Sequence, residues 1–182
     1  MIFDKDDNTM RQILLEMPQR IVPTGDDIVK EILDAPYEEL MNNLKDEGTF
    51  NNLNVRIFDA GNKSIGFVFL NDTEVVSVYV CRDSIATKGF QTLKSWRNLK
   101  YSGIFYKLFI SFILPKLKII ESDAQLSDMG KNFWVRLIDN NPKLNFYVKG
   151  SSGIIQIKDS KLLDNYFGDV ILNRNYTFIV TL

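Results

Sequence analysis

The sequence predicts an α/β (α+β) fold built on a mixed, mostly antiparallel sheet with a strand–helix–strand crossover at its centre. Three observations predict this class: helical apolar spacing in the first 48 residues, strand-like runs between turn residues after them, and an alternation of strands and helices further on. The length of 182 residues is usual for one domain, and no linker-like or low-complexity tract divides the chain. We therefore expect a single domain over residues 1–182.

The first 48 residues make up a helical N-terminal part. The segment RQILLEMPQRIVP fits a short strand or a short helix that Pro18 ends. Residues 24–48 place apolar side chains near helical spacing, with Pro36 inside the pattern. Asp34 precedes Ala35 and Pro36, and it is expected to cap a second helix with proline in its first turn. We therefore expect two helices here.

An antiparallel meander is expected after residue 52. Two β-rich runs in NVRIFDAGNKSIGFVFL flank the residues Asp59, Ala60, Gly61 and Asn62, which are typical of a hairpin turn. A third run, NDTEVVSVYV, follows by the same logic, and FQTLKSW is a fourth strand.

The rest of the chain alternates strands and helices. A buried helix is expected from about Tyr101 to Pro115, because its apolar residues form a wide face. A short strand, LKIIES, and a second helix, DMGKNFWVRLIDN, follow, and Asp128 suits the N-cap of that helix. Three late strands, LNFYVK, GIIQIK and YTFIVTL, carry the chain into a β-rich C-terminal extension over about residues 150–182. The inner stripe of the second helix is expected to be Phe133, Trp134, Leu137 and Ile138.

The composition excludes several kinds of site. The chain has no histidine and one cysteine, Cys81. A zinc site of the usual Cys/His type, a Ser–His or Cys–His nucleophile pair and an internal disulfide are therefore excluded within one chain. Acid–base chemistry would have to use Asp, Glu, Tyr, Lys, a terminus or bound water. We expect no metal site.

Charge and hydropathy give no reason to expect a nucleic-acid or membrane partner. The formal net charge is −1, and the three basic residues of LKSWRNLKY are typical of a solvated edge. The longest apolar run is broken by Lys107, Pro115 and Lys116, and the N-terminus is acidic and polar, unlike a signal peptide. We expect a cytoplasmic protein.

A polar run, ESDAQLSDMG, separates the strand LKIIES from the helix that follows it. Turn and capping chemistry explains Asp128, next to the helix. Ser122 and Asp123 instead stand at the end of a strand, and strand ends in α/β sheets commonly open into a ligand crevice. The run therefore predicts a strand end that lines a cleft and then a helix cap.

This run and the order of elements resemble the GNAT fold, in particular the small GNAT-like proteins of tailed bacteriophages. In those proteins the strand after the central helix runs into Ser-Asp, then Gln, then Gly, then a helix bearing Trp and Leu. The resemblance covers roughly residues 52–148. The matching residues are Ser122, Asp123, Gln125, Gly130, Trp134 and Leu137.

The resemblance implies an acyl-CoA-dependent N-acyltransferase that uses acetyl-CoA and acts on an amine of a host or phage macromolecule. The segment KYSGIF stands where the family binds pyrophosphate at a helix start. Phe105 stands where the family has Gly or Ala. The expected cofactor-binding residues are Lys100, Tyr101, Ser102 and Gly103.

The same resemblance assigns roles around the polar run. Asp123 is the expected catalytic base and Tyr147 the expected catalytic acid, although Tyr147 also suits a buried structural position. Ser122 and Gln125 are the expected substrate-binding residues.

A second function stays open beside acyl transfer. A GNAT-shaped protein that has lost catalysis would act by binding, as a virion component or as an inhibitor of a host defence protein. Phe105 in the phosphate path and the absence of an acidic residue from QTLKSW favour this alternative. The sequence therefore leaves open whether the chain is an enzyme.

Overall fold

The computed structural model describes residues 24–101, 103–123, 126–167 and 176–182. These residues divide into two compact units. Unit 1 holds residues 24–82 and 93–101, and unit 2 holds residues 83–92 together with the described residues from 103 to 182. Whether the units behave as the single expected domain stays a prediction.

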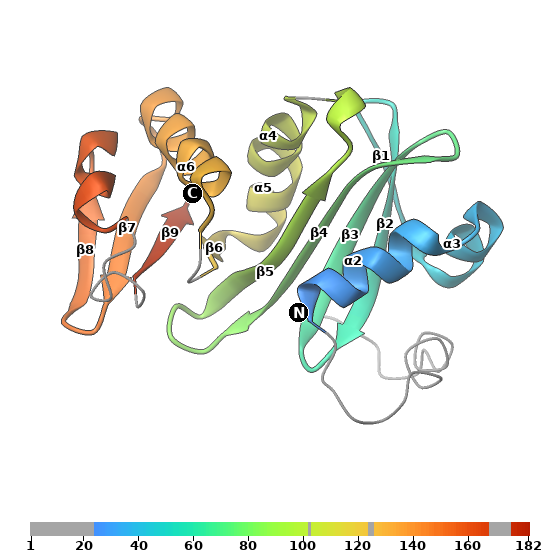
Figure 1. Cartoon of the computed structure of the whole chain (residues 1–182), viewed down its shortest axis with the longest axis horizontal. Helices are drawn as coiled ribbons and strands as arrows, with labels where there is room; N and C mark the ends of the chain where they lie inside the picture. The colour runs from blue at the N-terminus through green and yellow to red at the C-terminus, as the bar shows by residue number, and fades with distance from the viewer. Residues whose placement is uncertain (1–23, 102, 124–125, 168–175) are drawn as a thin grey trace. The chain divides into compact units, whose positions relative to one another are not determined.

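Unit 1 contains two helices followed by a run of strands (Figure 1). Its elements are α2 (Gly25–Asp34), α3 (Tyr37–Asn43), β1 (Lys45–Phe50), β2 (Leu53–Gly61), β3 (Ser64–Asn71), most of β4 (Glu74–Ser84), the second half of β5 (Gly89–Arg97) and the short 3₁₀ helix η1 (Leu99–Tyr101).

Unit 2 begins with the ends of β4 and β5 that lie between residues 83 and 92 and continues with alternating helices and strands. Its further elements are α4 (Ile104–Leu108), the π-helical turn η2 (Phe109–Ile113), α5 (Leu114–Leu117), β6 (Ile119–Glu121), α6 (Asp128–Asn140), β7 (Asn145–Gly150), β8 (Gly153–Ile157), the 3₁₀ helix η3 (Ser160–Asn165) and β9 (Thr177–Thr181).

The strands of the described residues form a nine-stranded sheet in the order β1-β2-β3-β4-β5-β6-β9-β7-β8. Among the pairs whose register is described, β5–β6 is parallel and the others are antiparallel. The predicted class, α+β with a mixed and mostly antiparallel sheet, is therefore confirmed.

Helix α2 begins at a capping box. The Thr24 hydroxyl accepts a hydrogen bond from the Asp27 backbone N–H, and the Asp27 carboxylate accepts one from the Thr24 backbone N–H. The helix ends at Asp34, because Ala35 takes the extended backbone that proline imposes on the residue before it. The N-cap of α3 is Pro36, so the two expected helices are confirmed but the expectation that Asp34 caps the second one is wrong.

Strand β1 lies where the end of the second helix was expected. It pairs antiparallel with β2, with a register shift between Asp46 and Gly48. Gly48 has φ +93°, a left-handed conformation that glycine adopts readily and that an α-helix does not contain. The helical interpretation of residues 45–48 is therefore wrong, because pairing with β2 satisfies the backbone of this segment instead.

Strands β2, β3 and β4 form the expected antiparallel meander. Asn62 and Lys63 form the first turn, and both have positive φ (48° and 61°), as a type I′ hairpin turn requires. The turn therefore lies slightly later than expected, because β2 continues through Asp59 to Gly61.

One apolar cluster of unit 1 lies between its two helices and one face of β2, β3 and β4, and Figure 1 shows α2 lying across these strands. Burial of these apolar side chains is the main term that holds the helices on the sheet. The buried residues of this cluster are Ile28, Val29, Ile32, Leu40, Leu44, Phe58, Ala60, Val68, Leu70, Val78 and Val80.

The expected buried helix is present in unit 2, but it begins at Ile104 and ends at Leu117. It is helical throughout as α4, η2 and α5. At the π turn the Leu114 N–H donates to the carbonyl of Phe109, five residues earlier. Tyr101, the expected start, lies in η1.

The short strand β6 lies between β5 and β9 in the sheet. It runs parallel to β5 at the pairs Phe90–Ile120 and Gln91–Glu121. On its other side it pairs antiparallel with β9, which also pairs with β7. The three late strands expected from the sequence are therefore confirmed.

Ser127 is the N-cap of helix α6, and its hydroxyl accepts a hydrogen bond from the Gly130 N–H at 3.2 Å. The expectation that Asp128 is the N-cap is wrong. Asp128 is the first residue of the helix, where its negative charge still favours the helix N-terminus. Of the expected inner stripe, Trp134, Leu137 and Ile138 are buried and Phe133 is half-buried.

Candidate functional site

Two of the expected cofactor-binding residues, Lys100 and Tyr101, contact a carboxylate in unit 1. Glu74 Oε2, on the first residue of β4, lies 2.8 Å from Lys100 Nζ and 2.7 Å from the Tyr101 hydroxyl, which both donate to it. Asn98 Nδ2 donates to Glu74 Oε1 at 3.0 Å, and Asn71 Nδ2 donates to the Tyr101 hydroxyl at 3.1 Å. We call these five residues the Glu74 network.

The Glu74 carboxylate compensates the positive charge of Lys100. Hydrogen bonds from Lys100, the largest effect, and from Tyr101 lower the pKa of Glu74, and the Glu74 carboxylate raises the pKa of Lys100. Both groups therefore stay charged at neutral pH. A phosphate placed at Lys100 would also meet the Glu74 carboxylate, so this pair of residues does not fit the expected pyrophosphate site.

Gly103 fits an approaching ligand better. It is the N-cap of α4 with φ +83°, and a Cβ added there would meet no atom within 4 Å. Among the residues that the structure describes, no side chain caps this helix start. Ser102, the remaining expected cofactor residue, lies outside the described residues.

The Phe105 ring is turned into the interior of unit 2. It is 6% exposed, and its centroid lies 6.1 Å from that of Phe109 and 5.4 Å from that of Phe133. Aromatic rings at these separations stabilise one another beyond the area they bury. The expectation that Phe105 stands in a phosphate path is therefore wrong, because its ring faces other aromatic rings.

Ser122, an expected substrate-binding residue, extends the pairing between β6 and β9. Its backbone N–H donates to the Phe178 carbonyl at 2.7 Å, and its hydroxyl accepts from the Phe178 N–H at 3.0 Å. The hydroxyl also donates to the Asp123 carbonyl at 2.8 Å. Ser122 is 2% exposed, and its hydroxyl is occupied by hydrogen bonds to backbone groups. Gln125, the other expected substrate-binding residue, lies outside the described residues.

The expected catalytic pair lies on two parts of unit 2. Asp123 is exposed, just after the carboxyl end of β6. Tyr147 is half-buried on β7, directly opposite Ile179 of β9, and Ile179 lies directly opposite Glu121 of β6. Since directly opposite residues point to the same face of a sheet, the register aligns Tyr147 with Glu121.

Glu121 is the centre of a buried polar cluster in unit 2. Its Oε1 accepts hydrogen bonds from the Lys149 ammonium and, at 2.6 Å, from the Thr177 hydroxyl. Its Oε2 accepts one from the Ser84 hydroxyl at 2.7 Å. Glu121 is 1% exposed. We call these four residues the Glu121 network.

The Glu121 network holds a carboxylate in its charged form. Burial alone would raise the pKa of Glu121, but the hydrogen bonds from Lys149, Thr177 and Ser84 outweigh it and the pKa is lowered. A carboxylate with a lowered pKa and three donors is a weak general base. Its hydrogen bonds instead join side chains of β6, β7, β9 and the end of β4.

No member of the Glu121 network stands out in the sequence as a candidate site residue. These residues are far apart in the chain, and only the strand register brings them together. One signal was present: Glu121 and Lys149 each follow directly on the apolar residues of a strand, and an ion that is buried there needs a partner of opposite charge.

Comparison of the chain with protein-family models, with curated proteins and with solved structures gives no match. In the part of the chain that the structure describes, no group of three or more His, Cys, Asp and Glu side chains is placed to hold a metal ion. No helix among those residues is long and apolar enough to cross a membrane.

Proposed function

We propose that this chain works by binding a macromolecular partner and not by acyl transfer. The observation that carries the proposal is the contact of Glu74 with both Lys100 and Tyr101. It places a negative charge where a pyrophosphate would need a positive one. The occupied Ser122 hydroxyl and the lowered pKa of Glu121 support the same conclusion.

The proposed partner follows from the resemblance to GNAT-like proteins of tailed bacteriophages. A protein of that kind would be a virion component or an inhibitor of a host defence protein. The parallel pair of β5 and β6, with the helix Ile104–Leu117 between them in the chain, supports the GNAT-like part of this proposal.

Calorimetry with acetyl-CoA tests the proposal. We expect no saturable heat of binding with the wild-type chain. We expect Glu74→Gln to bind acetyl-CoA measurably, because the substitution removes the carboxylate and frees Lys100. We expect the double variant Glu74→Gln with Lys100→Ala to bind acetyl-CoA about fivefold more weakly than Glu74→Gln. Saturable binding by the wild type, unchanged by both substitutions, would place acetyl-CoA elsewhere on the chain and defeat this proposal.

A second candidate is the N-acyltransferase that transfers an acyl group from acetyl-CoA to an amine. The exposed position of Asp123, just after the carboxyl end of the parallel strand β6, favours it, because ligands of α/β sheets bind at such strand ends. The amine nucleophile would lose its proton to the Asp123 carboxylate.

Asp123→Asn tests this candidate in an assay for release of free CoA with a panel of amines and protein extracts. An acyltransferase should lose turnover by about a hundredfold with an unchanged thermal midpoint, since only proton transfer is removed. Equal CoA release by the wild type and Asp123→Asn would exclude Asp123 as the base.

A further inference from the structure

Unit 1 contains a cavity of about 470 Å³ between α2, α3 and β2. Its volume is within the range of about 300–1,000 Å³ that is usual for small-molecule sites. The walls are apolar and come from the core of the unit. They are formed by Ile28, Ile32, Ala35, Leu40, Leu44, Phe58 and Ala60.

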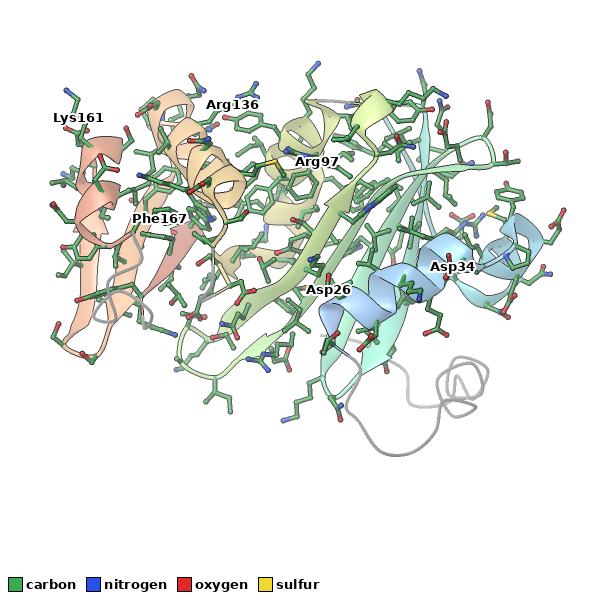
Figure 2. All side chains as sticks on the ribbon, in the orientation of Figure 1. Asp26, Asp34, Arg97, Arg136, Lys161 and Phe167 are labelled. Carbon is green, nitrogen blue, oxygen red and sulfur yellow. The ribbon has the colours of Figure 1, made fainter. Side chains whose placement is uncertain are left out.

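The rim of this cavity is acidic. Its charged side chains are Asp27, Glu31, Asp34 and Glu39, with Lys30 as the one basic residue among the lining residues that the structure describes. Asp34 is the last residue of α2, at the end opposite Asp26 (Figure 2), where the helix dipole opposes a negative charge. The excess of carboxylates favours a cationic ligand over an anionic one.

At the rim, the surroundings of Glu31 disfavour its charged form. Burial, and after it the charge of Glu39, raises the pKa of Glu31. No hydrogen bond or ion pair joins its carboxylate to another residue of the described part of the chain. A cation held beside Glu31 and Glu39 would relieve this repulsion between like charges.

We propose that the cavity binds a small amphiphilic amine, with its apolar body between the two helices and β2 and its ammonium group beside Glu31 and Glu39. The apolar walls favour a hydrocarbon body. The carboxylates of the rim then select a cationic head over a neutral or an anionic one. This site is independent of the Glu74 network and of the partner proposed for the chain.

Three probes with the same hydrocarbon tail test the proposal on the full-length protein: octylamine, octanol and octanoate. Binding is followed by NMR of isotope-labelled isoleucine methyl groups, which report on Ile28 and Ile32. We expect octylamine to bind about fivefold more tightly than octanol, and octanoate to bind more weakly than both. Equal affinity of octylamine and octanol, tighter binding of octanoate, or no binding of octylamine would each overturn the proposal.

Variants of α2 and α3 locate the ammonium group. Glu31→Gln should weaken octylamine about threefold and leave octanol unchanged. The matched control is Glu38→Gln, because Glu38 is an exposed glutamate of α3 that does not line the cavity, and it should change neither affinity. A loss of octylamine binding in Glu38→Gln equal to that in Glu31→Gln would overturn the placement beside Glu31.

Discussion

The Glu121 network of unit 2 and the Glu74 network of unit 1 use nearly the same chemistry in different surroundings. In each, a glutamate accepts hydrogen bonds from a lysine, a hydroxyl and one further polar side chain, and in each its pKa is lowered. The side chains of Glu121 and Lys149 are 1% and 26% exposed, whereas those of Glu74 and Lys100 are 40% and 66% exposed.

This difference in burial decides what each network contributes. When a buried charge loses its partner, no water can take the partner's place, so breaking the pair lowers the stability of the protein strongly. When an exposed pair breaks, water hydrates both charges, so the pair contributes little to stability. Breaking the Glu121 network should therefore destabilise unit 2, whereas breaking the Glu74 network should change the stability of unit 1 little.

Lys149→Met should have the largest effect. It leaves the Glu121 carboxylate buried without its cation, and we expect the free energy of unfolding to fall by about 3 kcal/mol, the lower part of the usual range because Lys149 keeps some exposure. Urea denaturation measures this loss.

The control is Lys158→Met, at an exposed lysine, which should change the unfolding midpoint little. Adding Glu121→Leu to Lys149→Met should restore much of the stability, because no buried charge then remains. A Lys149→Met variant as stable as Lys158→Met would show that the buried pair contributes nothing.

The pH dependence of stability should show a smaller effect. Because the folded-state pKa of Glu121 is lowered, its contribution is present above the unfolded value of 4.5 and is lost as the pH falls through the lower folded value. Below about pH 4.5 the wild type should lose stability more steeply than Glu121→Gln. Parallel curves of stability against pH for the two proteins would contradict this expectation.

Lys100→Met should have the smallest effect on stability. It breaks the exposed contact with Glu74, and water hydrates the carboxylate in its place. We expect a thermal midpoint close to that of the wild type. A loss comparable to that of Lys149→Met would remove the distinction between the two networks.

Much of the fold could be predicted because apolar periodicity and turn residues are local signals. The meander, the helix that contains Phe105, the helix that contains Trp134 and the late strands all follow from them. β1 was missed because its residues are mostly exposed and carry no alternating pattern, so only pairing with β2 identifies it. The caps at Asp34 and Asp128 were misplaced by a residue or two, which is the usual uncertainty of helix ends.

The candidate site could be predicted only in part, because side-chain partners distant in the sequence decide it. Lys100 and Tyr101 were found as neighbours in the chain, but the carboxylate that occupies them belongs to Glu74, on another strand. The direction of the Phe105 ring likewise depends on Phe133, in a later helix. Such contacts are set by how the strands and helices pack, which local sequence patterns do not encode.

The π turn from Phe109 to Ile113 has a consequence for insertions and deletions in the chain. One extra residue is accommodated within a helix that turns about 100° per residue. Deleting one residue of the turn should make it α-helical and leave Leu114 and Leu117 close to their buried positions, whereas deleting a residue of α4 would rotate the residues that follow by about 100°. A single deletion should therefore be tolerated better within the π turn than in the α-helical parts of this helix.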